Sequence, residues 1–231
     1  MSAKPMLCSF KTCPWVQRAA IVLRAKNIDY DITYIDRDKR PDWFLKISPH
    51  AKVPVLRIGE NDALFESNAI AEYLDETAAP QLHPADPVTR ARNRAWTDYV
   101  STFASAISQT MYSDSEEEFT RKSEKIAEVF GKLNDALAKR GNDGPFFNGP
   151  KLSLVDAAYA PFLQRYTFMN ALRPLGIHRQ GGFQATQVFT RLLHPGPALV
   201  VSNHPVNHIT AKPVRNTIVA KHPAFPLVYT S

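Results

Sequence analysis

The chain has 231 residues, of which 44% are hydrophobic and 22% charged, a composition that excludes a disordered or fibrous protein. No stretch approaches the roughly 20 apolar residues of a membrane-spanning helix, and no secretory signal pattern opens the sequence. Its two cysteines, Cys8 and Cys13, are too few for a disulfide framework. We therefore expect a cytoplasmic protein with no membrane partner.

The net charge of +6 is unevenly distributed. Residues 1–156 carry 21 basic and 22 acidic residues, whereas residues 157–231 carry seven basic residues and no acidic residue. A basic segment can indicate contact with a nucleic acid or an anionic membrane. Here the basic residues are scattered among Pro, His and apolar residues. We therefore expect no nucleic-acid partner.

The first third of the chain predicts an α/β domain over residues 1–78. Apolar and alternating runs predict strands at 7–10, 30–35, 51–58 and 63–65, and helical periodicity predicts helices at 14–26, 42–47 and 67–75. Strand, helix and strand within about 30 residues indicate parallel strands joined by a right-handed crossover. The turn at 59–62 predicts a hairpin. The expected order is βαβαββα.

A proline-rich linker at 79–88 separates this part from a helical one. Helical patterns at 88–111 and 115–140 precede Ser153-Leu-Val-Asp156, a capping-box pattern that predicts a third helix to about residue 171. We expect an all-α domain over 89–177. Beyond it the periodicity fails, so residues 178–231 are an atypical, basic, acid-free C-terminal segment.

Cys13 lies where the first predicted strand gives way to the first predicted helix. Pro14 suits the first helical position, because its fixed φ fits the turn and its missing N–H has no helical partner to lose. Cys13 would then be the N-cap, near unpaired N–H groups and the positive end of the helix dipole. We expect the pKa of its thiol to lie below that of free cysteine, which suits a nucleophile. The alternative is a small buried cysteine beside a helix start.

The dipeptide Val53-Pro54 opens the third predicted strand. Proline early in a strand suits a cis peptide bond, which we expect here, with a trans proline on an edge strand as the alternative. The N–H and C=O groups of Val53 would then be free to pair with an extended peptide.

The dipeptide Glu66-Ser67 precedes the last helix of the first domain. We expect Ser67 to be the N-cap, and such a helix terminus also favours a carboxylate ligand. Glu66 beside it could accept an ammonium group, although capping and a surface charge explain the pair equally well. Together with Cys13 and Val53, the pair suits a small thiol peptide with a free amino-acid end.

The sequence resembles the cytosolic glutathione transferases, and most closely their cysteine-type, omega-like branch. The resemblance rests on motifs in family order and spacing, at 12–18, 41–44, 48–56, 64–74 and 152–162. It implies a thioredoxin-like domain followed by an all-α domain, glutathione as co-substrate with no metal, and a homodimer. It also implies a pocket between the domains for a small hydrophobic or thiol-reactive substrate.

The resemblance assigns roles to residues at matching positions. Cys13 would form a mixed disulfide with glutathione, Val53 and Pro54 would hold its cysteinyl backbone, and Glu66 and Ser67 its γ-glutamyl end. The glycyl carboxylate falls to Lys52 or Arg40, each of which is otherwise a solvated charge. Trp15 is a candidate both for binding glutathione and for lining the substrate pocket, and Tyr112 and Arg165 are the other candidates for the pocket.

The implied activity is thiol transfer or dehydroascorbate-reductase-like reduction by the Cys13 thiolate. The alternatives are glutathione conjugation to electrophiles and a non-catalytic binding module, as in the stringent starvation proteins. The resemblance ends near Ile177, where the family continues with helices that cover the pocket. A frameshifted coding sequence or an unusual basic tail would each explain the departure.

Overall fold

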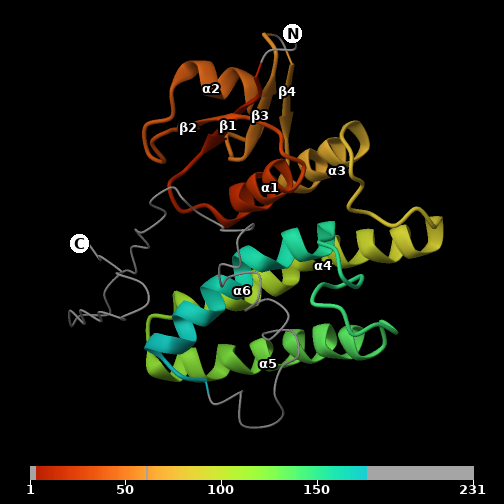
Figure 1. Ribbon diagram of the computed structural model, residues 1–231. Coiled ribbons are helices and arrows are strands. Elements are labelled where there is room, and N and C mark those ends of the chain that lie inside the picture. Colours follow the sequence, from red (N-terminus) through yellow and green to blue (C-terminus); the bar gives the residue numbers. More distant parts are fainter. Residues whose placement is uncertain (1–3, 61, 176–231) are drawn as a thin grey trace.

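The computed structural model describes residues 4–60 and 62–175 (Figure 1). The predicted segment at 178–231 lies outside the described residues. No helix in the described part of the chain is long and apolar enough to span a membrane.

The first part of the chain forms a mixed four-stranded sheet with helices on both faces. Its strands are β1 (Met6–Ser9), β2 (Asp31–Tyr34), β3 (Val55–Ile58) and β4 (Asp62–Phe65), and its helices are α1 (Pro14–Ala25), α2 (Asp42–Ile47) and α3 (Ser67–Thr77). The strand order is β2-β1-β3-β4, with β1 parallel to β2 and antiparallel to β3. This confirms the predicted βαβαββα order, and the antiparallel β3–β4 pair confirms the hairpin.

The second part consists of α4 (Pro87–Met111), α5 (Glu116–Ala138) and α6 (Leu154–Leu172). Helix α4 packs against both α5 and α6, and α6 also packs against α1. The predicted capping box is confirmed: the Ser153 side chain accepts from the Asp156 N–H, and the Asp156 carboxylate accepts from the Ser153 N–H. Helix α6 thus packs the helical part against the α/β part (Figure 1), and Arg94 of α4 adds ion pairs with Glu72 and Glu76 of α3.

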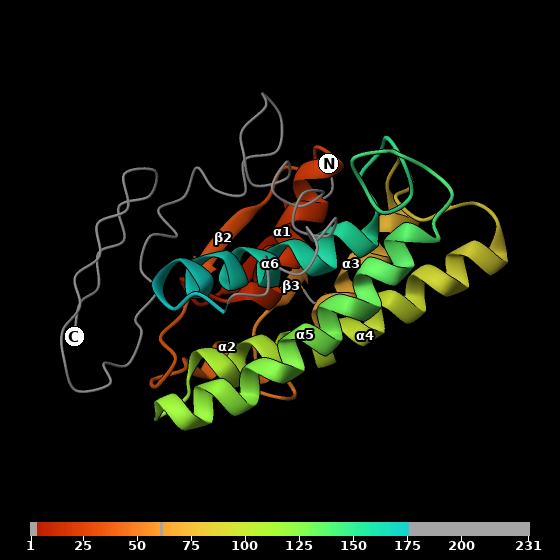
Figure 2. The same ribbon diagram turned by 90° about the horizontal axis from the view of Figure 1, so that it is seen from below.

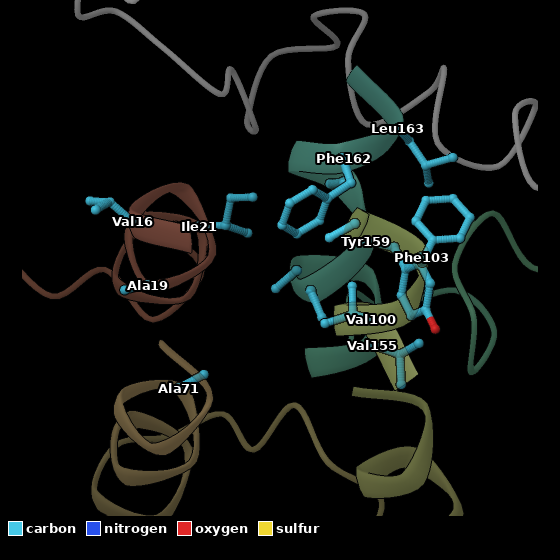
Figure 3. Close-up of a cluster of buried hydrophobic side chains, with 14 of the residues drawn as sticks. Val16, Ala19, Ile21, Ala71, Val100, Phe103, Val155, Tyr159, Phe162 and Leu163 are labelled. Carbon is cyan, nitrogen blue, oxygen red and sulfur yellow. The ribbon is translucent and has the colours of Figure 1, made fainter. Parts of the chain in front are cut away.

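Helix α1 is buried on two sides. Helix α2 covers one face of the sheet, while α1 and α3 lie on the other, between the sheet and the helical part (Figure 1). Ile21 of α1 points toward Phe162 of α6, whereas Val16 points away from α6 (Figure 3). The Trp15 and Phe162 rings meet edge to face, with centroids 4.7 Å apart. The start of α1 is therefore fixed from both sides by apolar packing.

Candidate functional site

Cys13 occupies the N-cap of α1, as the sequence predicts. Its backbone is extended, with φ −75° and ψ 119°, and Pro14 follows at the first helical position. The Cys13 N–H donates to the C=O of Phe10 at 3.3 Å, and the Cys13 C=O accepts from the Gln17 N–H at 3.3 Å. The thiol makes no capping hydrogen bond. The sulfur therefore sits at the positive end of α1 without being committed to the cap.

The pKa of the Cys13 thiol is raised, contrary to the prediction from its N-cap position. Burial is the main cause, because the loss of water disfavours the thiolate. The N–H groups of Val16 and Trp15 oppose this rise, as do the guanidinium groups of Arg165 and Arg37. The prediction was wrong because it counted the helix terminus but not the burial.

Arg165 reaches this region from α6. One of its terminal nitrogens, Nη2, donates to the C=O of Thr12 at 2.5 Å. The other, Nη1, donates to Oε1 of Gln17 and to the C=O of Pro161, each at 2.8 Å. The residue is only 8% exposed. Arg165 therefore links α6 directly to the segment that carries Cys13.

The segment before β3 presents a backbone that is not used by the sheet. The Val53–Pro54 peptide bond is cis, as predicted. Ser48 Oγ fixes the preceding turn, because it accepts from the Lys52 N–H at 3.0 Å and donates to the Lys52 C=O at 2.9 Å. Within the described residues, neither the N–H nor the C=O of Val53 has a backbone partner.

Glu66 and Ser67 form the start of α3, but one position away from the predicted arrangement. Helix α3 begins at Ser67, so Glu66 rather than Ser67 is the N-cap. Glu66 has φ 66°, a left-handed conformation that is costly for a residue with a Cβ and is often found at functional sites. Its Oε1 lies 3.1 Å from Nδ1 of His50. The predicted start of the helix at residue 67 is thus confirmed, whereas the assignment of Ser67 as the N-cap was wrong, because an argument from residue type does not register the positive φ of Glu66.

A cavity of about 380 Å³ lies where these segments meet. Its wall includes most of the predicted glutathione-binding residues, namely Trp15, Lys52, Val53, Pro54, Glu66 and Ser67. The structure does not bring every predicted residue to this wall, since Cys13, Arg40, Tyr112 and Arg165 are not among those that line it. Cys13 is the N-cap of the helix that contributes Trp15, two residues further along the chain, to this wall.

Three predicted site residues, Arg40, Tyr112 and Arg165, contact other parts of the protein instead of lining the cavity. Arg40 is exposed, and its guanidinium lies 5.9 Å from the centroid of the Phe10 ring. Tyr112 is 54% exposed at the C-cap of α4 and interacts electrostatically with Arg165. Arg165 is bound to Thr12, as described above.

Two family models together match more than half of the chain. The models "Glutathione S-transferase, N-terminal domain" and "Glutathione S-transferase, C-terminal domain" match residues 7–82 and 116–199. A probable glutathione S-transferase of Nicotiana tabacum is 33% identical over 158 residues, which make up 68% of each chain. The chain belongs to the glutathione S-transferase family.

Two further proteins show where the similarity within this family lies. Glutathione S-transferase omega-1 of Rattus norvegicus is 33% identical over 159 residues, covering 68% of this chain and 65% of the rat protein. The match thus spans slightly less than two thirds of that relative. The solved structure of rice GST1 in complex with glutathione is 26% identical, with a TM-score of 0.66 over 82% of each chain.

Sequence reasoning missed several residues that line the cavity. They include Arg18 from α1, His50, Asn68 from α3, and Asp98 from α4. Arg18 is only 2% exposed, and its Nη1 donates to Oδ1 of Asn68 at 3.3 Å. Its Nε and Nη2 are buried without a partner among the described residues. A charged residue at a core position of α1, between Gln17 and Ala19, was the available sequence signal.

Metal ligands are a separate question. Among the described residues, no group of three or more His, Cys, Asp or Glu side chains could hold a metal ion.

Proposed function

We propose that this protein is a glutathione-dependent thiol transferase in which Cys13 forms a mixed disulfide with glutathione. The observation that carries the proposal is the position of Cys13 at the N-cap of α1, the helix that contributes Trp15 to the cavity lined by Val53, Glu66 and Ser67. The mixed sheet with a cis-proline before β3, the family membership and the omega-1 relative all support it.

Glutathione binding follows from the chemistry of the cavity wall. The unpaired N–H and C=O groups of Val53 suit the cysteinyl backbone of an extended tripeptide. The N-terminus of α3 suits the γ-glutamyl carboxylate, and Glu66 suits the adjacent ammonium group. Lys52, which lines the cavity, is better placed than Arg40 for the glycyl carboxylate. The rice relative solved with glutathione supports this choice of ligand.

The proposed reaction has two exchanges. The Cys13 thiolate attacks the glutathionyl sulfur of a substrate disulfide, so that a Cys13–glutathione disulfide forms and the substrate thiolate leaves and takes up a proton. A second glutathione, as thiolate, then attacks the glutathionyl sulfur of that disulfide. Oxidised glutathione leaves, and Cys13 returns as thiolate. The substrate sulfur is reduced to a thiol and one free glutathione is oxidised, because the other half of the oxidised glutathione comes from the substrate disulfide, and no other reductant is required.

The test is Cys13→Ser, assayed by reduction of a mixed disulfide between glutathione and a small thiol. We expect thiol transfer to fall to background, because serine cannot form the disulfide intermediate. Cys8→Ala is the matched control, since Cys8 is fully buried in the core and should not take part. Thiol transfer that persists in Cys13→Ser and is lost in Cys8→Ala would contradict the assignment.

Conjugation of glutathione to electrophiles is the second candidate, and one observation favours it. Burial raises the pKa of the Cys13 thiol, and a protonated thiol can donate a hydrogen bond to the thiolate of bound glutathione. Conjugation would then survive in Cys13→Ser, whose hydroxyl can donate in the same way. A chlorodinitrobenzene assay on the same variant separates the two reactions.

A non-catalytic binding module is the remaining alternative to an enzyme, and a homodimer is the expected oligomeric state. Retention on glutathione resin distinguishes a transferase from a module that has lost the tripeptide site. Sedimentation of the full chain tests the homodimer.

A further inference from the structure

Arg165 is a buried cation whose described partners are all neutral. It is 8% exposed, and its hydrogen bonds go to the C=O of Thr12, the C=O of Pro161 and the side-chain oxygen of Gln17. Burial lowers its pKa to about 10, and the groups that oppose this lowering are Cys13 and Tyr112. Within the described residues, no carboxylate neutralises the guanidinium.

A buried charge is costly unless an opposite charge accompanies it. Three neutral carbonyl oxygens accept hydrogen bonds from the guanidinium, but they do not neutralise its positive charge. Two groups near Arg165 can become anions. Tyr112 is 54% exposed to water, whereas Cys13 is largely buried beside the guanidinium. The Cys13 thiolate is therefore the better counter-charge.

The hydrogen bonds of Arg165 also bracket the cysteine along the chain. Thr12 directly precedes Cys13, and Gln17 lies one helical turn after it, with its N–H on the Cys13 C=O at 3.3 Å. A single guanidinium thus holds both ends of the turn that carries the sulfur. Arg37, the other cation that faces Cys13, is exposed and stacks on Phe10 at 5.6 Å. Its charge is screened by water and salt, and that of Arg165 is not.

We propose that Arg165 is a positioning residue that fixes the Thr12–Cys13 turn and serves as the counter-charge of the Cys13 thiolate. The helical domain would in this way supply the charge that lets a buried thiol of the α/β domain ionise. When Cys13 ionises, its proton leaves to solvent and the guanidinium keeps its own. The inference rests on the proposed function, in which Cys13 is the nucleophile, and replaces the expectation that Arg165 lines the substrate pocket.

The test measures the ionisation of Cys13 directly rather than turnover. The alkylation rate with iodoacetamide is followed against pH in the wild type, Arg165→Met, Arg165→Lys and Arg37→Gln, without glutathione. Peptide mass spectrometry verifies that Cys13, not Cys8, carries the label. In Arg165→Met we expect the midpoint of the plot of alkylation rate against pH to rise by at least about one pH unit. This rise lowers the alkylation rate at neutral pH about tenfold. In Arg165→Lys the midpoint should return most of the way to the wild-type value, because lysine keeps the positive charge. Of the three variants, Arg37→Gln should change the midpoint least.

Two outcomes would overturn the inference. One is an unchanged midpoint in a folded Arg165→Met variant. The other uses the wild type alone and so does not depend on any variant folding: salt is raised from about 20 mM to about 500 mM. If the Cys13 thiolate is paired with the buried Arg165, the midpoint of its alkylation curve should stay almost constant as salt is raised. If the exposed Arg37 stabilises the thiolate instead, the midpoint should shift clearly upward. Because neither readout requires glutathione, failure here is distinguishable from failure of the proposed function, which the Cys13→Ser assay measures.

Discussion

Two buried arginines, Arg18 and Arg165, dominate the electrostatics at the scale of single residues. Each is at least nine-tenths buried, and burial lowers the pKa of each to about 10. Their surroundings differ. The guanidinium of Arg165 donates three hydrogen bonds to oxygen acceptors, whereas Arg18 has two nitrogens without a partner among the described residues and lines the cavity. Arg18 is therefore suited to an anion that enters from outside.

Replacement of Arg18 by Met should weaken glutathione binding. The γ-glutamyl carboxylate, placed at the N-terminus of α3, would lie beside Asn68, the residue that Arg18 contacts. A hydrogen bond to a charged group is worth about 1.5–3 kcal/mol, so we expect affinity to fall roughly 10- to 150-fold by isothermal titration calorimetry.

Two glutathione analogues serve as controls for this prediction. The analogue without the γ-glutamyl carboxylate should bind the wild type and Arg18→Met with similar, weak affinity. The analogue that lacks only the amino group should still distinguish them. Equal losses for both analogues would mean that Arg18 acts through folding and not through the carboxylate.

The two arginines also mark the limit of inference from the sequence at this scale. Cys13 could be placed at the N-cap because the decisive neighbours, Thr12 and Pro14, adjoin it in the chain. Arg165 lies 148 residues from Gln17 and 153 from Thr12, so its contacts depend on how α6 packs on α1. The burial that raises the pKa of Cys13 likewise comes from packing. Neither effect has a local sequence signature.

At the scale of elements, α6 was predicted from its start and not from its periodicity. Most of its residues are buried, so its apolar residues do not form one stripe, and Pro161 lies inside it. The capping box was the dependable signal, because it requires only residue types at fixed spacing. The start of α3 at Ser67 was predicted correctly, but its N-cap was assigned to Ser67 instead of Glu66, since the positive φ of Glu66 has no counterpart in residue type.

The capping box of α6 should contribute strongly to stability because it is buried. Asp156 is fully buried and accepts from the Phe147 N–H at 2.9 Å, the Ser153 N–H at 2.8 Å and the Ser153 hydroxyl at 2.6 Å. Asp156→Ala leaves these donors without an acceptor. We expect the free energy of unfolding to fall by about 2–4 kcal/mol in urea titrations.

Helix α4 offers a matched control for this prediction. Asp86 caps α4 by accepting from the N–H and hydroxyl of Thr89, at 2.8 and 2.6 Å, but it is exposed. Water can replace the lost acceptor there, so Asp86→Ala should cost clearly less than Asp156→Ala. Equal costs would mean that burial of the α6 cap is not what makes it important.

At the scale of the whole molecule, α1 is the element shared by both parts. It packs on α6 (Figure 2). Its C-cap, Lys26, is bound to Asp75 of α3 and to the C=O groups of Ala78 and Pro80 in the following linker. The candidate site lies near the contact between α1 and α6. The linker that leads to α4 begins near the contacts of Lys26. The positions of Cys13 and of the helical part therefore depend on the same helix.

The buried ion pair at the far end of α1 provides the last prediction. Lys26 Nζ lies 2.9 Å from Oδ1 of Asp75, with side chains 0% and 4% exposed, and also donates to the C=O groups of Ala78 and Pro80. Lys26→Met leaves the Asp75 charge buried without its partner, which typically costs about 3–5 kcal/mol. Chemical denaturation should report a loss of this size, whereas Lys132→Met, which removes an exposed pair with Glu128 and a contact of Nζ with the Tyr99 ring at 5.7 Å, should cost clearly less. Similar small losses in both variants would show that the junction is held by apolar packing of α1 alone.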